Sequence, residues 1–444
     1  MFNYIVKYIT FPLYYSQRKI PLLRALRELE KSQWQSQEEL KNLQWNKFKK
    51  LITYAYENTE YYHNLLDNDS INIESIKDWP DLERIPILPK EIARANLNKL
   101  ISKKASKKNY YRSSGSSGMP ITVYKDENAL AWQMAAKWRG RRWNGIDIGD
   151  RILQLCGEDK DRTYLDAIED RLVDNKTFFV AQEITKETIK KYLGLYHRIK
   201  PDLIYGYAHS IYEFAYLIKQ GKLMVKHQPK VIICTSEVLW EHQKNLIEQV
   251  FGVKVKNEYG CKEFHLIAFE CTYGNMHIAQ ENLIVEFLNN GLPAGEGEIA
   301  DIVITDLTNY EMPLIRYKLG DRGSFKNTTC PCGRNLAIMD IKIGRDADMV
   351  KIENNINFHP DIFSIPHKMP YYDEVKAFKV IQNTLTDFKI LIDASDNAKP
   401  HLKNHFDNVL SEYIGNDTNV EYSFISPIPK DPSGKLGYFR SNVK

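Results

Sequence analysis

The spacing of apolar residues divides the chain into regions of different secondary structure. In residues 20–66, leucine and aromatic positions recur every three or four residues with charges between them, which predicts helices. Pro80, Pro86 and Pro89 then interrupt the pattern, because proline cannot continue a helix. The chain therefore begins with a helical region that ends before residue 90.

Short apolar runs and helical patterns alternate in the middle of the chain. A helix capped by Asp126 is expected to run to about Arg142. The alternation that follows predicts a mainly parallel sheet with helices on its faces. The expected strands are Arg151–Cys156, Thr177–Val180, Leu203–Tyr207, Val231–Thr235 and Val253–Asn257, and the expected helices are Lys186–Ile199, His209–Gln220 and Glu241–Phe251.

The pattern changes again from Leu283 onward. Runs such as LIVEFL and EIADIVITDL predict a β-rich region, and residues 345–444 mix short strands with one helix near Pro400–Ile414. We therefore expect an α/β fold, in which a large N-terminal domain with mixed sheets and a β-rich subdomain precedes a small α+β C-terminal domain. The sequence contains no internal repeats.

Composition narrows the class of protein. A chain of 444 residues is long enough for more than one domain. Its 61 basic and 57 acidic residues give a net charge of +4, a balance too even to indicate a nucleic-acid partner. Six cysteines are too few and too unevenly spaced for a disulfide framework, so a cytoplasmic location is expected.

The first residues, MFNYIVKYITFPLYY, form an apolar and aromatic run that contains Lys7. The run lacks the small-residue pattern of a cleavage site and is too short to span a bilayer. It predicts a helix that packs on the protein or lies at an interface, with membrane contact at most peripheral. The sequence leaves open whether the chain forms a homodimer.

The stretch Tyr110–Tyr124 is rich in small polar residues, with four serines, two glycines, a proline and a threonine within ten positions. Glycine lets the backbone close on a ligand, and each serine adds a hydroxyl donor. Such a loop can wrap a polyphosphate. It is not a Walker loop, because neither GKS nor GKT follows Gly115. A flexible connection is the alternative interpretation.

Two neighbouring predicted strands end in polar groups, since Cys234–Glu237 ends one and Glu258–Glu263 follows the next. Ligands of an open parallel sheet bind beyond the carboxyl ends of its strands. Tyr259 could stack on a base, Gly260 lets the backbone approach a ligand, and Glu263 could hold Mg²⁺. The alternative is a surface carboxylate beside a core tyrosine.

Two further stretches each offer one candidate charged residue. Asp321 ends the run RYKLGD, where a carboxylate is suited to the two hydroxyls of a ribose, although a simple Gly-Asp turn would look the same. Lys435 lies on the tight turn PSGK near the end of the sequence. The alternative there is one more solvated lysine.

A metal site is a separate hypothesis. His265 and Cys271, together with Cys330 and Cys332, supply one nitrogen and three sulfurs in two short pairs. That set matches a structural tetrahedral zinc site, which does no chemistry of its own. The alternative is free cysteines and a helix histidine.

The stretches SSGSSGMP, SE followed by YGCKE, RYKLGD, GRDAD and PSGK occur in this order from about residue 90 to the end. Together they resemble the adenylate-forming superfamily of acyl-CoA synthetases, nonribosomal adenylation domains and luciferases. ENTEYYHNLL and CPCGR make the chain most similar to the phenylacetate-CoA ligase branch, including CapK-like proteins of capsular polysaccharide biosynthesis. The resemblance implies a helical N-terminal region over 1–89, an AMP-binding core over 90–344 and a mobile C-terminal lid domain over 345–444.

The resemblance also implies residue roles. Glu263 would bind Mg²⁺, Arg345 would lie at the hinge near the nucleotide, and Lys435 would reach the carboxylate and the α-phosphate; these three are the expected catalytic residues. Where relatives carry a second acidic or lysine hinge residue, this chain has Ala347, which puts the domain rotation in doubt. The expected acyl-pocket residues are Tyr207 and His209, with Gly260 beside them. The expected ATP and AMP ligands are Ser113, Ser114, Gly115, Ser116, Ser117, Gly118, Ser236, Glu237, Tyr259, Gly260, Asp321 and Arg345.

The implied reaction joins a carboxylic acid to AMP, using ATP and Mg²⁺, and then transfers the acyl group to a thiol, with CoA expected. Transfer to an amine in glycan decoration is the alternative second step. A non-catalytic scaffold is the alternative of another class, although Glu263, Asp321, Arg345 and Lys435 are all present. The sequence does not identify the acid.

Overall fold

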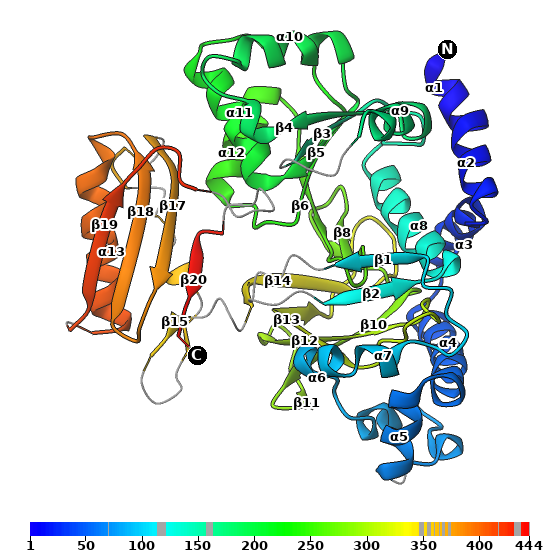
Figure 1. Cartoon of the computed structure of the whole chain (residues 1–444). Helices are drawn as coiled ribbons and strands as arrows, with labels where there is room; N and C mark the ends of the chain where they lie inside the picture. Colours follow the sequence, from blue (N-terminus) through cyan, green and yellow to red (C-terminus); the bar gives the residue numbers. More distant parts are fainter. Residues whose placement is uncertain are drawn as a thin grey trace.

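The computed structural model is built around a single twelve-stranded sheet (Figure 1). Its strand order is β11-β10-β12-β13-β14-β9-β8-β7-β6-β5-β3-β4. The strands β3 to β7 are parallel to their neighbours within that group, whereas the remaining pairs are antiparallel. The structure describes residues 1–443 except 70, 113–120, 157–162, 346–349, 353–356, 359, 364, 366–368, 372–373, 416 and 430–436.

Helices precede the sheet and then alternate with its parallel strands. Ser36 forms a capping box at the start of α4, and Thr59 caps α5, which explains why the long helical pattern divides where it does. The helices are α1 Phe2–Ile5, α2 Phe11–Gln17, α3 Leu22–Ser32, α4 Gln37–Asn58, α5 Glu60–Asn68, α6 Lys90–Ala95, α7 Leu97–Leu100, α8 Glu127–Trp143, α9 Tyr164–Val173, α10 Ile189–Ile199, α11 Ala208–Gln220, α12 Glu241–Phe251 and α13 Ala398–Tyr413. A π-helix, η1 Val6–Thr10, joins α1 to α2, and the short 3₁₀ helices are η2 Ile73–Ser75, η3 Trp79–Arg84, η4 Ala181–Glu183 and η7 Pro360–Phe363.

The predicted strands of the large sheet agree closely with the observed ones. The predicted parallel sheet and the predicted β-rich region are joined into one sheet, because β8 pairs with both β7 and β9. The strands are β1 Asn109–Arg112, β2 Thr122–Lys125, β3 Ile152–Cys156, β4 Lys176–Val180, β5 Leu203–Tyr207, β6 Val231–Thr235, β7 Val255–Tyr259, β8 Ala268–Glu270, β9 Met276–Ile278, β10 Leu283–Asn289, β11 Leu292–Pro293, β12 Ala300–Asp306, β13 Tyr317–Lys326, β14 Ile338–Arg345, β15 Val350–Lys351, β16 Asn357–Phe358, β17 Val375–Gln382, β18 Asp387–Ala394, β19 Asn419–Phe424 and β20 Phe439–Ser441.

Alternate residues of the parallel strands face two different helical layers. Tyr205 belongs to the core with α3 and α8, whereas Ile204 belongs to the core with α10, α11 and α12. Side chains alternate between the two faces of a strand, so a strand covered on both sides is apolar throughout. This confirms the predicted sheet with helices on both faces.

The C-terminal part has its own four-stranded sheet, in the order β19-β18-β17-β20, which packs with α13 around a separate core. The structure confirms the predicted small α+β unit. It contacts the large domain where the Tyr212 hydroxyl donates to the Val375 carbonyl at 3.2 Å and where Trp240 meets Tyr438 edge-on. None of the helices in the described part of the chain is long and apolar enough to cross a membrane.

A buried ion pair ties the N-terminal helices to the sheet. Arg139 of α8 donates to both carboxylate oxygens of Glu281, at 2.5 and 3.0 Å, and both side chains are about 1% exposed. Arg139 also donates to the Leu29 carbonyl of α3 at 3.0 Å, and Ser32 donates to Glu281. A buried pair tolerates the loss of one partner poorly, because the other charge stays in a dry environment.

We therefore expect Arg139→Ala to lower the free energy of unfolding by about 3–5 kcal/mol, measured by urea unfolding followed by circular dichroism. Arg24→Ala is the matched control, since Arg24 is largely exposed and pairs with Glu28 on its own helix. A midpoint for Arg139→Ala that coincides with that of the control would contradict the role assigned to this pair.

Candidate functional site

The carboxyl ends of β5, β6 and β7 bring several predicted residues to one edge of the sheet. Tyr207 ends β5, Ser236 follows β6 and Tyr259 ends β7. Ser236 adopts a φ of +66°, a left-handed conformation that is uncommon for a residue with a side chain. Strained backbone of this kind is often found at functional sites.

Tyr259 and Asp321 are in direct contact, although 62 residues separate them in sequence. The Tyr259 hydroxyl donates to the Asp321 carboxylate at 2.8 Å. Asp321 lies on β13, and its main chain pairs with that of Arg345 on β14. The structure therefore brings together the residues predicted for the adenine, the ribose and the hinge.

Gly260 is required where β7 leaves the sheet. A Cβ at this position would lie 1.7 Å from the His265 carbonyl oxygen, much closer than any side chain can approach. The following loop closes on itself, because the His265 N–H donates to the Cys261 carbonyl at 2.7 Å. A larger residue at 260 would displace the loop that carries Glu263.

Glu263 is buried and held by a cation that the sequence did not indicate. Lys90, the first residue of α6, lies 3.0 Å from the Glu263 carboxylate, and the Tyr317 hydroxyl lies 3.4 Å from the same oxygen. Burial alone would raise the pKa of Glu263, but the nearby Lys90 ammonium and hydrogen bonds to the carboxylate outweigh it and hold that pKa below its usual range. The carboxylate is therefore ionised at neutral pH, as a cation ligand must be.

The predicted acyl-pocket histidine contacts a predicted nucleotide residue. The His209 backbone N–H donates to the Glu237 carboxylate at 2.9 Å, and its ring lies 3.3 Å from Glu213. This places the start of α11 against the turn after β6.

A largely buried polar cluster lies where α8 packs on β5 and β7, and sequence reasoning missed it. Lys137 of α8 donates to Tyr205 at 2.6 Å and lies 3.1 Å from Glu258. Tyr205 in turn donates to Glu258 at 2.8 Å. Lys137 and Lys90 are each one charged residue in an otherwise ordinary helical pattern, so no local signal distinguishes them.

Several predicted residues lie outside the described part of the chain. These are the serine- and glycine-rich segment between β1 and β2, the PSGK segment near the end of the sequence, and the second residue after Arg345. The undescribed predictions are Ser113, Ser114, Gly115, Ser116, Ser117, Gly118, Ala347 and Lys435.

Three of the four predicted metal ligands come together, but the histidine beside them is His277 and not His265. The ligand atoms of Cys271, His277, Cys330 and Cys332 all lie within 4.8 Å of one another. The predicted His265 is instead half-buried, with its ring edge-on to Tyr111 at 4.8 Å. The prediction rested on the short spacing between His265 and Cys271, whereas the β8–β9 hairpin turns the chain back and presents His277 to the cysteines.

The geometry of this cluster fits a tetrahedral metal ion. The Cys271 and Cys330 sulfurs are 3.6 Å apart, and the Cys332 sulfur is 3.3 Å from His277 Nε2. Zinc with bonds of about 2.0–2.3 Å separates its ligand atoms by roughly 3.5–3.8 Å. His277 Nδ1 lies 3.1 Å from the Leu336 carbonyl, which orients Nε2 toward the sulfurs. Burial lowers the pKa of His277, so its ring is neutral and able to bind a metal.

Known proteins resemble the chain along most of its length. Residues 362–442 match the family described as CapK C-terminal domain. The chain is 22% identical to Protein CapK of Staphylococcus aureus, over 91% of this chain and 90% of that protein. It is 24% identical to a phenylacetate-coenzyme A ligase of Thermus thermophilus, over 85% of this chain and 86% of that protein.

A solved structure shares the whole fold. The crystal structure of 2-hydroxyisobutyryl-CoA ligase in the postadenylation state, in complex with R3-HIB-AMP, superposes with a TM-score of 0.73 at 17% identity, covering 92% of this chain and 90% of that one. The large sheet and the small C-terminal unit therefore form the adenylate-forming fold. The chain is thus similar along most of its length to CapK and phenylacetate-CoA ligases, and it shares the adenylate-forming fold.

Proposed function

We propose that this protein is an AMP-forming ligase that activates a carboxylic acid with ATP and transfers the acyl group to a thiol, that of CoA. The observation that supports this most is the contact between Tyr259 and Asp321 beside the buried, ionised Glu263. The proposed base and ribose ligands are therefore in direct contact, and the proposed cation ligand lies on the loop that follows Tyr259. Relatives named as CoA ligases match most of the chain.

In the proposed first step, a carboxylate oxygen of the acid attacks the α-phosphorus of ATP. The bond from that phosphorus to the oxygen that bridges the α- and β-phosphates breaks. Pyrophosphate leaves with this oxygen and with the electron pair of the broken bond. Glu263 would hold Mg²⁺, which neutralises phosphate charge, while Tyr259 and Asp321 fix the nucleoside. Positioning and charge neutralisation are the principal means by which a protein accelerates such a displacement.

In the proposed second step, the thiolate attacks the acyl carbon of the adenylate and AMP leaves. An amine acceptor remains the alternative, because the chain is also similar to Protein CapK. Pyrophosphate exchange measured with and without CoA distinguishes the two halves of the reaction, since exchange requires the first step alone.

We expect the protein to exchange pyrophosphate into ATP when both Mg²⁺ and a suitable carboxylic acid from a screened panel are present. Glu263→Gln should lower this exchange by about 10²–10³-fold, because a preorganised charge is removed from the phosphate site. Glu187→Gln, at an exposed position, is the control and should exchange normally. Folded protein that binds no ATP by calorimetry would exclude the enzyme proposal and favour a scaffold.

Lys435 separates the two half-reactions. Its ammonium would sit where negative charge gathers as the carboxylate meets the α-phosphorus, so Lys435→Ala should lower adenylate formation by about 10²–10³-fold. ATP affinity should change little, and thioester formation from a synthetic acyl-adenylate should survive. Lys430→Ala, earlier in the same stretch of sequence, is the matched control. Wild-type exchange by Lys435→Ala would identify Lys435 as an ordinary surface lysine.

We also propose that Cys271, His277, Cys330 and Cys332 hold a structural Zn²⁺. The cluster joins the β8–β9 hairpin to the turn before β14, and four protein ligands would close the coordination shell. A closed shell leaves no position for water or substrate, so the ion would stabilise these turns and take no part in the reaction.

Purified protein should therefore contain about one zinc per chain. Both Cys330→Ser and His277→Ala should lower the zinc content and the melting temperature, because metal binding contributes directly to folding. Cys156→Ser is the control, as Cys156 lies on β3 and outside the cluster. Elemental analysis that finds no metal in protein prepared without chelators would refute this site, and full zinc in His277→Ala would refute the choice of histidine.

A further inference from the structure

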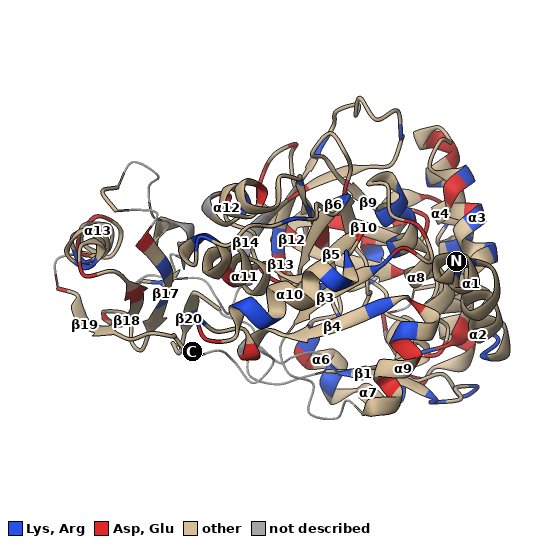
Figure 2. Cartoon of the chain, turned by 90° about the horizontal axis from the view of Figure 1, so that it is seen from above, with Lys and Arg blue, Asp and Glu red and all other residues tan. Residues whose placement is uncertain are grey.

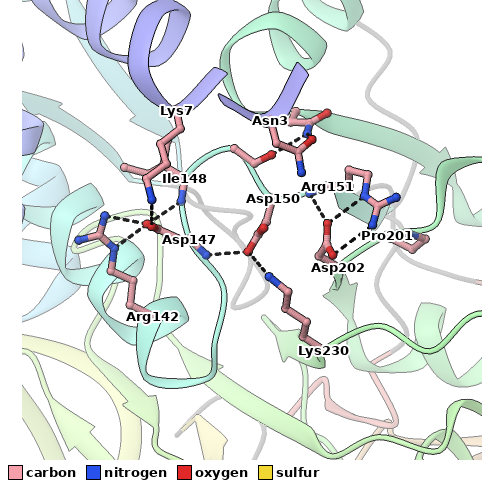
Figure 3. Close-up of polar contacts among 12 residues, drawn as sticks. Asn3, Lys7, Arg142, Asp147, Ile148, Asp150, Arg151, Pro201, Asp202 and Lys230 are labelled. Carbon is pink, nitrogen blue, oxygen red and sulfur yellow. Dashed lines mark hydrogen bonds and ion pairs between the residues drawn. The ribbon is translucent and has the colours of Figure 1, made fainter. Parts of the chain in front are cut away.

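Many lysine and arginine side chains of this protein pair with carboxylates near the surface. Basic and acidic residues are interspersed over the helices that surround the sheet (Figure 2). In the loop between α8 and β3, for example, Asp147 lies 2.6 Å from Lys7, and Asp150 lies 2.8 Å from Lys230 (Figure 3). These two lysine side chains are 34% and 47% exposed, so water solvates them as well. Ion pairs of this kind contribute little to stability.

Lys125, the last residue of β2, has a different environment. Its side chain is fully buried, and its two hydrogen-bond acceptors are neutral: the Gln133 side chain at 2.7 Å and the Lys262 carbonyl at 2.9 Å. Burial lowers the pKa of Lys125 to about 8, although the Asp306 carboxylate opposes this effect, so the group is still an ammonium at neutral pH. Lysine is rarely buried in this way, because removing its charge from water is costly. An apolar side chain here would serve stability as well or better, so the charge points to another role.

The carboxylate that balances Lys125 is reached through an amide. Gln133 of α8 accepts from Lys125 and donates to Asp306, at the end of β12, at 2.9 Å. The backbone N–H and the hydroxyl of Thr308 donate to the other Asp306 oxygen at 2.9 and 2.6 Å. All four side chains are at most 2% exposed. The ammonium therefore has a fixed position between α8 and the antiparallel part of the sheet.

The hairpin of β1 and β2 contacts the loop after β7 on both sides of Glu263. Lys125 binds the carbonyl of Lys262, the residue before it. Tyr111 of β1 meets the ring of His265, two residues after it, edge-on at 4.8 Å. The Lys125 ammonium also lies over the Tyr111 ring, 5.0 Å from its centre, so the two contacts support each other.

We propose, on the basis of the proposed function, that Lys125 is a positioning residue for Mg²⁺-bound ATP. Its hydrogen bond to the Lys262 carbonyl holds the backbone of the loop, while Lys90 at 3.0 Å holds the Glu263 carboxylate itself. The cation ligand is thereby ordered before the cation binds, and less conformational entropy is lost on binding. Groups that orient a metal ligand in this way commonly change metal affinity by about 10–100-fold. Lys125 touches neither substrate nor cation and takes no part in bond making.

The test uses Lys125→Met, which removes the donor and keeps an unbranched side chain. Calorimetry with ATP, in the presence and absence of Mg²⁺, measures how much the cation strengthens nucleotide binding. We expect the variant to bind ATP without Mg²⁺ about as well as the wild type does. The gain in affinity on adding Mg²⁺ should fall by about tenfold or more, and the Mg²⁺ concentration for half-maximal pyrophosphate exchange should rise by a similar factor.

Lys47→Met is the matched control. Lys47 of α4 also donates to a backbone carbonyl, that of Glu281, at 2.8 Å, and it also lies over an aromatic ring, that of Trp132, at 4.0 Å. Burial lowers its pKa to about 8, as it does for Lys125. Both variants should lower the melting temperature, because each leaves a carbonyl without its donor. Only Lys125→Met should change the dependence on Mg²⁺.

A second variant, Tyr111→Leu, weakens the other contact at a half-buried position and should shift the Mg²⁺ dependence in the same direction. It decides the question if Lys125→Met does not fold, since an unchanged Mg²⁺ dependence in Tyr111→Leu would then overturn the proposal. Folded Lys125→Met with wild-type Mg²⁺ dependence would also overturn it, and so would an equal shift in Lys47→Met. Wild-type protein that binds no ATP would overturn the proposed function as well, whereas these other results leave the proposed function standing.

Discussion

The fold depends on the junction at which the parallel part of the sheet meets its antiparallel part. The chain leaves β7 at Gly260, makes a loop closed by the contact between His265 N–H and the Cys261 carbonyl, and returns antiparallel as β8. Because a Cβ at Gly260 would meet the His265 carbonyl at 1.7 Å, the reversal is as tight as backbone packing allows. Without it the two halves would form separate sheets, and Tyr259 would not reach Asp321.

Features that depend on local sequence could be predicted, whereas features that depend on long-range strand pairing at this junction could not. The parallel strands, the capped helix α8 and the C-terminal unit follow from hydrophobic periodicity, and the structure confirms them. Glu263 and Asp321 could be singled out because each follows a recognisable strand or turn. That Tyr259 contacts Asp321 could not be predicted, because it depends on long-range strand pairing.

The structure places a different histidine from the predicted one beside the three cysteines, for a related physical reason. His265 precedes Cys271 by the same interval at which His277 follows it, so spacing gave no stronger grounds for one than for the other. The loop after Gly260 turns the His265 ring against Tyr111, whereas β9 carries His277 back alongside Cys271. Likewise, Lys90 and Lys137 carry no local signal, because their carboxylate partners, Glu263 and Glu258, are far away in sequence.

The ion pair of Lys90 and Glu263 keeps a charged carboxylate in the interior of the large domain. The carboxylate is about 2% exposed, yet the ammonium at 3.0 Å keeps it ionised. A divalent cation bound to Glu263, as proposed, would lie close to that ammonium, and the two positive charges would repel each other in an environment of low dielectric constant. Phosphate oxygens relieve this repulsion, since they carry the negative charge that both cations need. Cation and nucleotide would therefore bind better together than singly, which is what a site built for a metal-bound triphosphate requires.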